Sequence, residues 1–162
     1  MADDKYLVTA EEIAAMEGLH KAHFLNDNAR RTNKSLGDLT GLTGIGFHVI
    51  EVAPGRETTE YHRHYHEDEA VFVLAGTATA EIGDETVAIK PGDFIGYRKG
   101  GKAHTIRNTG SETLRMIVVG ERLPYDVGDY PRLRKRIYRQ AGLKANVVEF
   151  DAIQEPVLVA KK

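Results

Sequence analysis

Alternation of apolar and polar residues over short runs dominates the middle of the chain, from Gly44 to Gly120. Successive side chains of a strand point to opposite faces, so this alternation predicts strands that border a core. Glycine and proline interrupt the runs about every 8 to 12 residues, which is typical of an all-β sandwich or barrel, the jelly-roll barrel included. The predicted strands are Ile45–Ala53, Tyr61–His66, Glu69–Ala75, Thr77–Ile82, Thr86–Ile89, Phe94–Tyr97, Ala103–Asn108 and Thr113–Gly120.

The strand Glu69–Ala75 is apolar on both faces. Val71 and Val73 share the face of Glu69, while Phe72 and Leu74 form the other. A strand of this kind is covered on both sides. One face is therefore predicted to line the barrel interior. A terminal segment or a second subunit is predicted to cover the other, so a homodimer is one expectation.

The first 43 residues are expected to pack on the outside of the barrel formed by residues 44–120. Thr9 and Glu12 have the spacing of a capping box, which predicts a short helix ending near Gly18. Residues 26–43 are rich in asparagine and arginine and are predicted to be a long polar loop, either packed on the body or acting as a lid.

Residues 121–162 are predicted to form a C-terminal extension of the same single domain. Leu123–Gly128 has the composition of a turn-rich connector, and the basic stretch Arg132–Gly142 predicts one helix. Asn146–Phe150 is predicted to be a strand and residues 155–162 a loosely held tail. The arginines of the predicted helix have two interpretations, a solvated face or an anion site.

Composition narrows the classes of function. The chain has 162 residues, a formal net charge of −2 and 28% charged residues, which is ordinary for one globular domain and argues against nucleic acid or an anionic membrane as the main partner. It has no cysteine, so disulfides and thiolate metal sites are excluded. No secretory signal and no apolar run of ~20 residues are seen, and the expected location is cytoplasmic.

Histidines at alternate positions are the clearest candidate chemistry. His62 and His64 would lie on one face of a strand, and Glu69 opens the next strand after a short turn. Two imidazoles and a carboxylate can bind a first-row divalent metal and leave positions open. The alternative is a pair of solvated surface histidines. His20 and His23 have no such spacing to an acid and are interpreted as surface or interface residues.

Two motifs in this region resemble the sequence signatures of the cupin superfamily. The first is His62-x-His64-x4-Glu69-x6-Gly76, and the second is Gly101-x2-His104-x3-Asn108 within residues 92–108. Two departures are visible. Gly55 is one residue further from His62 than is usual, and Lys99 stands where the second motif normally has a proline. The missing proline removes turn rigidity, not a ligand.

The resemblance covers residues 44–120 and implies a cupin-type jelly-roll barrel, a double-stranded β-helix. It also implies one divalent ion held by His62, His64, Glu69 and His104. Neutral imidazole and carboxylate suit iron, manganese, nickel, cobalt or zinc, and the sequence does not choose among them. His66 is the rival ligand, although it is too near Glu69 for the family spacing.

Several further residues are candidates for binding or catalysis. His48 and Tyr97 lie on strands predicted to neighbour the metal and are the candidate acid/base residues. Arg98 and Lys99 precede a glycine turn near His104 and could hold a substrate anion, or be ordinary loop charges.

Three functions remain open from the sequence. The single-domain cupins that this chain most resembles are those grouped with sugar-phosphate isomerases, which implies a metal-dependent enzyme acting on a small polar molecule. An iron-dependent dioxygenase could use the same ligands. A third possibility is a module that binds a small molecule without converting it.

Overall fold

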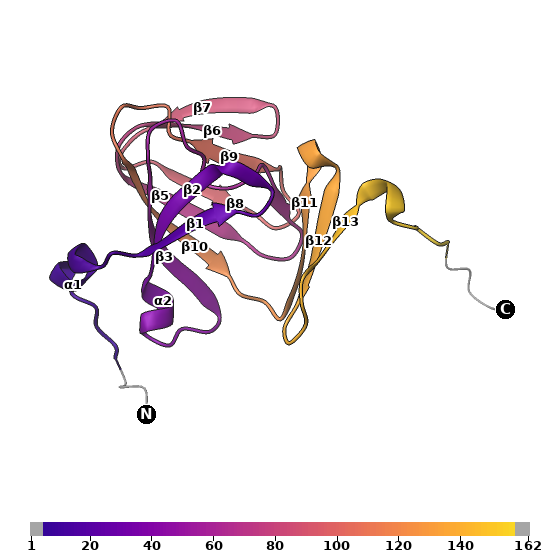
Figure 1. Ribbon diagram of the computed structural model, residues 1–162, viewed down its shortest axis with the longest axis horizontal. Coiled ribbons are helices and arrows are strands. Elements are labelled where there is room, and N and C mark those ends of the chain that lie inside the picture. The colour runs from indigo at the N-terminus through magenta and orange to yellow at the C-terminus, as the bar shows by residue number, and fades with distance from the viewer. Residues whose placement is uncertain (1–4, 158–162) are drawn as a thin grey trace.

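The computed structural model describes residues 5–157 and shows a fold built almost entirely of antiparallel strands (Figure 1). A six-stranded sheet has the order β1-β2-β3-β10-β5-β8, and a three-stranded sheet has the order β7-β6-β9. A further sheet of four strands, β13-β12-β11-β4, stands beside them. The all-β architecture expected from the sequence is confirmed.

The elements of the first half of the chain are α1 (Ala10–Ala15), β1 (Leu19–His23), β2 (Asn26–Ser35), α2 (Leu36–Leu39), β3 (Ile45–Val52), β4 (Arg63–His64), β5 (Glu69–Ala75) and β6 (Ala78–Ile82). The second half contains β7 (Glu85–Ile89), β8 (Phe94–Tyr97), β9 (His104–Arg107), β10 (Leu114–Glu121), β11 (Tyr125–Tyr130), β12 (Lys135–Gln140), β13 (Asn146–Glu149) and the 3-10 turns η1 (Pro131–Leu133) and η2 (Phe150–Ala152).

The hydrophobic core lies between the six-stranded and the three-stranded sheets. The larger sheet contributes Val52, Val73 and Leu114, none of them measurably exposed, and the smaller sheet contributes Ala80 and Ile106. Apolar side chains fill only part of the space between the sheets. Histidines and a glutamate replace them toward one end, where β5 and β9 begin.

Strand β5 has the two faces that its sequence predicted. Val71 and Val73 point inward and are 3% and 0% exposed, whereas Phe72 on the opposite face is 41% exposed. Phe94 of the neighbouring strand β8 pairs with Phe72 and is 67% exposed. The inner face is therefore part of the core as predicted, and the outer face carries exposed aromatic side chains.

The N-terminal helix is confirmed, but the predicted polar loop at residues 26–43 is wrong. Thr9 Oγ1 accepts from the amide of Glu12, and Glu12 Oε2 accepts from the amide of Thr9, which completes the capping box. Residues 26–35 form β2, which pairs with β1 on one side and with β3 on the other. The short helix α2 follows.

The helix predicted over Arg132–Gly142 in the C-terminal extension is wrong, because this region contains the strand β12. Most of the predicted connector, residues 123–128, belongs to β11 (Tyr125–Tyr130), and residues 135–140, expected to be part of a helix, form β12. The predicted strand near residues 146–150 is present as β13. Figure 1 shows β11, β12 and β13 as an orange layer at one side of the barrel. The predicted tail, residues 155–162, lies outside the described residues from residue 158 onward.

Within residues 5–157, no helix has the length and apolar character needed to span a membrane.

Candidate metal centre

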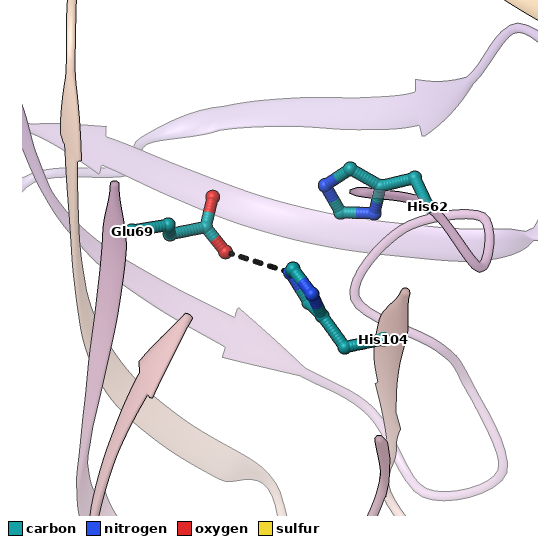
Figure 2. Close-up of side chains that lie close together, drawn as sticks. All are labelled: His62, Glu69 and His104. Atoms are coloured by element: carbon teal, nitrogen blue, oxygen red, sulfur yellow. Dashed lines mark ion pairs between the residues drawn. The ribbon is translucent and has the colours of Figure 1, made fainter. Parts of the chain in front are cut away.

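Three side chains from separate elements converge at the open end of the core. His62 comes from the loop before β4, Glu69 from the start of β5 and His104 from the start of β9 (Figure 2). One nitrogen or oxygen atom of each lies within 4.8 Å of the others. His104 Nε2 is 3.6 Å from Glu69 Oε1, and the rings of His62 and His104 are 4.7 Å apart between centroids. Backbone hydrogen bonds between His62 and His104, in both directions, fix the spacing of the two strands at this point.

His64 brings a fourth donor atom to the same place. Its Nε2 lies 3.1 Å from Nε2 of His62. On the far side of each ring, Nδ1 of His62 is 2.9 Å from the carbonyl oxygen of Glu60, and Nδ1 of His64 is 2.6 Å from a carboxylate oxygen of Asp126. Both acceptors require a proton on Nδ1, so in the neutral rings both Nε2 atoms carry lone pairs. Two lone pairs at this distance need a cation between them, either a proton or a metal ion.

His104 follows the same pattern. Its Nδ1 is 3.3 Å from the carbonyl oxygen of Lys102, while its buried Nε2 has no hydrogen-bond partner among the described residues. A buried nitrogen without a partner is costly unless something binds it. The orientation of all three rings by oxygen acceptors on Nδ1 is the arrangement that metal-bound histidines commonly have.

The protonation states of His62 and Glu69 suit a metal. Burial, and next the neighbouring His104, lower the pKa of His62 to about 3, so that His62 is neutral at pH 7. Burial alone would raise the pKa of Glu69, but the contact with His104 and the nearby His62 outweigh it and lower that pKa to about 2. Neutral imidazole and ionised carboxylate are the forms that bind divalent ions. The residues therefore fit a divalent metal ion held by His62, His64, Glu69 and His104.

A second group of potential ligands, His64, Glu67 and Asp126, is better explained as an ion-pair network. Arg139 of β12 pairs with both carboxylates and is 2.9 Å from Asp126 Oδ2. Asp126 also accepts the backbone amide of His66 at 3.1 Å. Arginine already supplies the positive charge that these two buried acids need. Their effect on the centre is to hold His64 in place.

Of the other predicted site residues, His48 and Tyr97 lie at the cavity and His66 does not. His48 and Tyr97 both line the cavity that contains the four donor atoms. Tyr97 stacks on the ring of His104 at 3.5 Å between centroids, and its buried hydroxyl has no partner among residues 5–157. His66, the rival ligand, packs on Tyr125 and does not line this cavity.

The arginines expected to hold an anion lie elsewhere. Arg98 and Lys99 are exposed and do not line the cavity. The arginines of η1 and β12 are paired with acids, for example Arg132 with Glu81 and Arg136 with Asp129. None of these residues lines the cavity that contains the four donor atoms.

The cavity has a volume of about 330 Å³ and contains two arginines that the sequence interpretation missed, Arg31 and Arg122. It also contains His23, which was expected to be a surface or interface residue, whereas His20 is exposed. A signal for Arg31 was present. Ala29, Arg31 and Asn33 occupy alternate positions of β2 and face inward. Two of these three residues are polar, so the sequence pattern does not resemble that of a strand that faces an apolar core.

Comparison with known proteins supports the fold and gives one near relative. The model of the cupin domain family matches residues 48–120. A crystal structure from Acidithiobacillus ferrooxidans, provisionally named a sugar phosphate isomerase, is 48% identical to this chain. It covers 94% of this chain and 97% of its own, with a TM-score of 0.91. None of the curated proteins matches the chain.

More distant structures share the fold alone. A cupin-superfamily protein from Silicibacter pomeroyi, named a sugar phosphate isomerase, is 23% identical over 86% of this chain and 91% of its own, with a TM-score of 0.78. A polyketide cyclase from Streptomyces resistomycificus is 24% identical over 57% of this chain and 66% of its own, with a TM-score of 0.51. Different activities on one fold mean that the reaction must be argued from the site.

Proposed function

The chain belongs to the cupin superfamily, and we propose that it is a metal-dependent enzyme that isomerises a sugar phosphate. The observation that carries the proposal is the cavity lined by His48 and Tyr97, in which His62, Glu69 and His104 bring donor atoms within 4.8 Å of one another and Nε2 of His64 lies 3.1 Å from Nε2 of His62. The 48% identical protein named for this activity spans nearly the whole chain, which supports the choice of reaction.

An aldose–ketose isomerisation exchanges a carbonyl and a hydroxyl on adjacent carbons. One hydrogen moves from the hydroxyl-bearing carbon to the carbonyl carbon, and one proton moves from the hydroxyl oxygen to the carbonyl oxygen. A divalent ion bound to the four donors would polarise those two oxygens. The cavity, at about 330 Å³, is at the lower end of the range of small-molecule sites, about 300–1,000 Å³, and suits a compact substrate of this kind.

His48 is the residue we assign to proton transfer at the substrate oxygens. The Asn33 amide lies 3.2 Å from Nδ1 of His48 and donates to it, so the neutral ring carries its proton on Nε2. Burial first, and the charge of Arg122 next, lower the pKa of His48 below its usual 6.5 and keep the ring neutral at pH 7. A neutral imidazole with a fixed tautomer can donate a proton to an oxygen and recover it.

Tyr97 contributes as a hydrogen-bond donor. Burial, and next the charge of Glu69, raise the pKa of its hydroxyl, so the hydroxyl stays protonated throughout the physiological range. Its position against the ring of His104 places that donor beside the centre.

The test is turnover of a panel of aldose and ketose phosphates by protein loaded with each candidate metal. We expect at least one substrate to be isomerised, the activity to be lost with a chelator and restored by metal. The His64→Ala variant should lose both bound metal and activity. His66→Ala is its matched control, because His66 is two residues away and does not line the cavity.

Absence of metal-dependent turnover on every sugar phosphate would refute the proposal. Consumption of oxygen by the iron-loaded protein would instead support the dioxygenase alternative. Stoichiometric metal with neither activity would support a binding protein.

A further inference from the structure

We propose that Arg31 binds the phosphate group of the substrate inside the cavity. The inference rests on the proposed function for the identity of the substrate, but its structural evidence is separate from the metal ligands. It assigns an anion-binding role to a residue of β2, outside the part of the chain matched by the cupin family model.

The guanidinium of Arg31 is incompletely satisfied by the protein. It lies in the wall of the cavity, where Nη1 donates to the carbonyl oxygen of Thr58 at 2.6 Å. Its Nε is buried and has no hydrogen-bond partner among residues 5–157. A buried N–H of a charged group that is left unpaired is a costly arrangement, and a ligand that accepts from it removes that cost.

Charge balance points to an anion as that ligand. The ion pairs of residues 5–157 include none with Arg31, whereas Arg122, the other arginine of the cavity, is paired with Asp38. The carboxylate whose charge acts on Arg31 is that of Glu69, and Glu69 belongs to the metal centre. Arginine keeps its charge even when partly buried, so the cavity presents a cation without a committed counter-ion.

The shape of the group selects among anions. A guanidinium presents its N–H groups in a fixed planar fork that matches two oxygens of a phosphate or a carboxylate. With Nη1 taken by Thr58, the edge that includes Nε is the one left for the ligand. A phosphate ester and a carboxylate share this chemistry, and the experiment below separates them.

The position of Arg31 on the sheet explains how one molecule could contact both parts of the cavity. Strand β2 pairs with β3, so Arg31 lies on the wall that also carries His48, while the donors of the metal centre come from β5, β9 and the segment around β4. A sugar phosphate has its phosphate at one end of the molecule and its reacting oxygens at the other. This arrangement matches a cavity with a cation on one wall and metal ligands on the next.

The experiment measures binding by calorimetry to the metal-loaded protein. The probes are inorganic phosphate, ribose 5-phosphate, ribose and ribonate. The variants are Arg31→Gln, which removes the charge, and Arg31→Lys, which keeps the charge but not the planar fork. Arg30→Gln is the matched control, because Arg30 is the next residue of the same strand, is exposed and directs its Nε to the carbonyl oxygen of Asp27.

We expect Arg31→Gln to bind phosphate and ribose 5-phosphate about 10- to 100-fold more weakly, which is the usual effect of losing charged hydrogen bonds in a cavity. Its affinity for ribose and its metal content should not change. Arg31→Lys should lie between Arg31→Gln and the wild type, and Arg30→Gln should equal the wild type. If Arg31→Gln fails to fold, the loss in Arg31→Lys decides the question.

Equal phosphate affinity in the wild type and the Arg31 variants would overturn the inference, as would a wild type that binds no phosphate. Selective loss of ribonate binding would reassign the site to a carboxylate. The two proposals fail separately. Phosphate binding that depends on Arg31, without isomerisation of any sugar phosphate, leaves this inference and refutes the function. Isomerisation that is unaffected in Arg31→Gln supports the proposed function and refutes the assignment of Arg31 to the phosphate.

Discussion

Replacing Asp126 by asparagine should weaken metal binding although Asp126 is not among the proposed ligands. Asp126 is 2% exposed, and its two oxygens receive three donors: Nδ1 of His64, Nη2 of Arg139 and the backbone amide of His66. An asparagine has one acceptor oxygen and one NH₂ group, so it can satisfy only one side of this arrangement.

Either orientation of the new amide harms the centre. If its NH₂ faces His64, the ring must accept on Nδ1 and carry its proton on Nε2, where it can no longer bind a metal. If its oxygen faces His64, the NH₂ is directed at the amide of His66 and repels it. Loss of such an orienting partner typically weakens metal binding about 10- to 100-fold, or about 1.4–2.7 kcal/mol.

The assay is competition for the metal against a chelating dye, with thermal unfolding of the metal-free protein alongside. Asp129→Asn is the matched control, because Asp129 lies on the same strand, is also 2% exposed and binds Arg63, Arg136 and Tyr65 but no proposed ligand. We expect similar losses of unfolding temperature in both variants and weaker metal binding in Asp126→Asn alone. An equal loss of metal affinity in both, or none in Asp126→Asn, would refute the reasoning.

Three further outcomes follow from the structure. Because burial and the charge of Arg122 lower the pKa of His48, Arg122→Gln should move that pKa upward toward 6.5, and an NMR titration of the ring that shows no change or a downward shift would contradict this. Asn108 is 0% exposed, donates to the carbonyls of residues 52 and 112, and accepts from the amide of residue 110. Asn108→Ala should therefore lower the free energy of unfolding, measured in urea, by about 2–4 kcal/mol while the metal content stays unchanged, and a loss below about 1 kcal/mol would contradict this. We propose that the exposed aromatic face of β5 and β8 is covered by a second copy of the chain, so sedimentation should give a dimer for the wild type and a monomer for Phe94→Glu, and a monomeric wild type would remove the dimer.

The barrel strands could be predicted because their local pattern and their environment agree. Val71 and Val73 alternate with more exposed positions, and the turns that bound their strand contain glycine. Gly76, for example, has a φ of 78°, and an added Cβ would lie 2.8 Å from the carbonyl oxygen of Thr113. The grouping of His62, Glu69 and His104 could be predicted for a related reason. It depends on the alternation of side chains along strands and on the spacing of the two cupin motifs.

The flanking strands could not be predicted from the same rules. Strand β2 is made of residues with low strand propensity, and its inward positions Arg31 and Asn33 face a polar cavity in place of an apolar core. The basic strand β12 looks like a helix in isolation. Its charges are neutralised by acids from other strands, such as Asp129 for Arg136 and Glu149 for Lys135, and no local pattern reveals those partners.

The pairing of β4 with β11 limits how small a working fragment of this protein can be. Strand β4 has only two residues, and its sheet partners are Gly128 and Asp129 of β11. A fragment trimmed to residues 48–120, the region shared with the cupin family model, would keep all four donor residues but leave the backbone beside His64 without its neighbouring strand. Chimeras that graft this pocket onto another protein should therefore carry the segment through residue 140 with it.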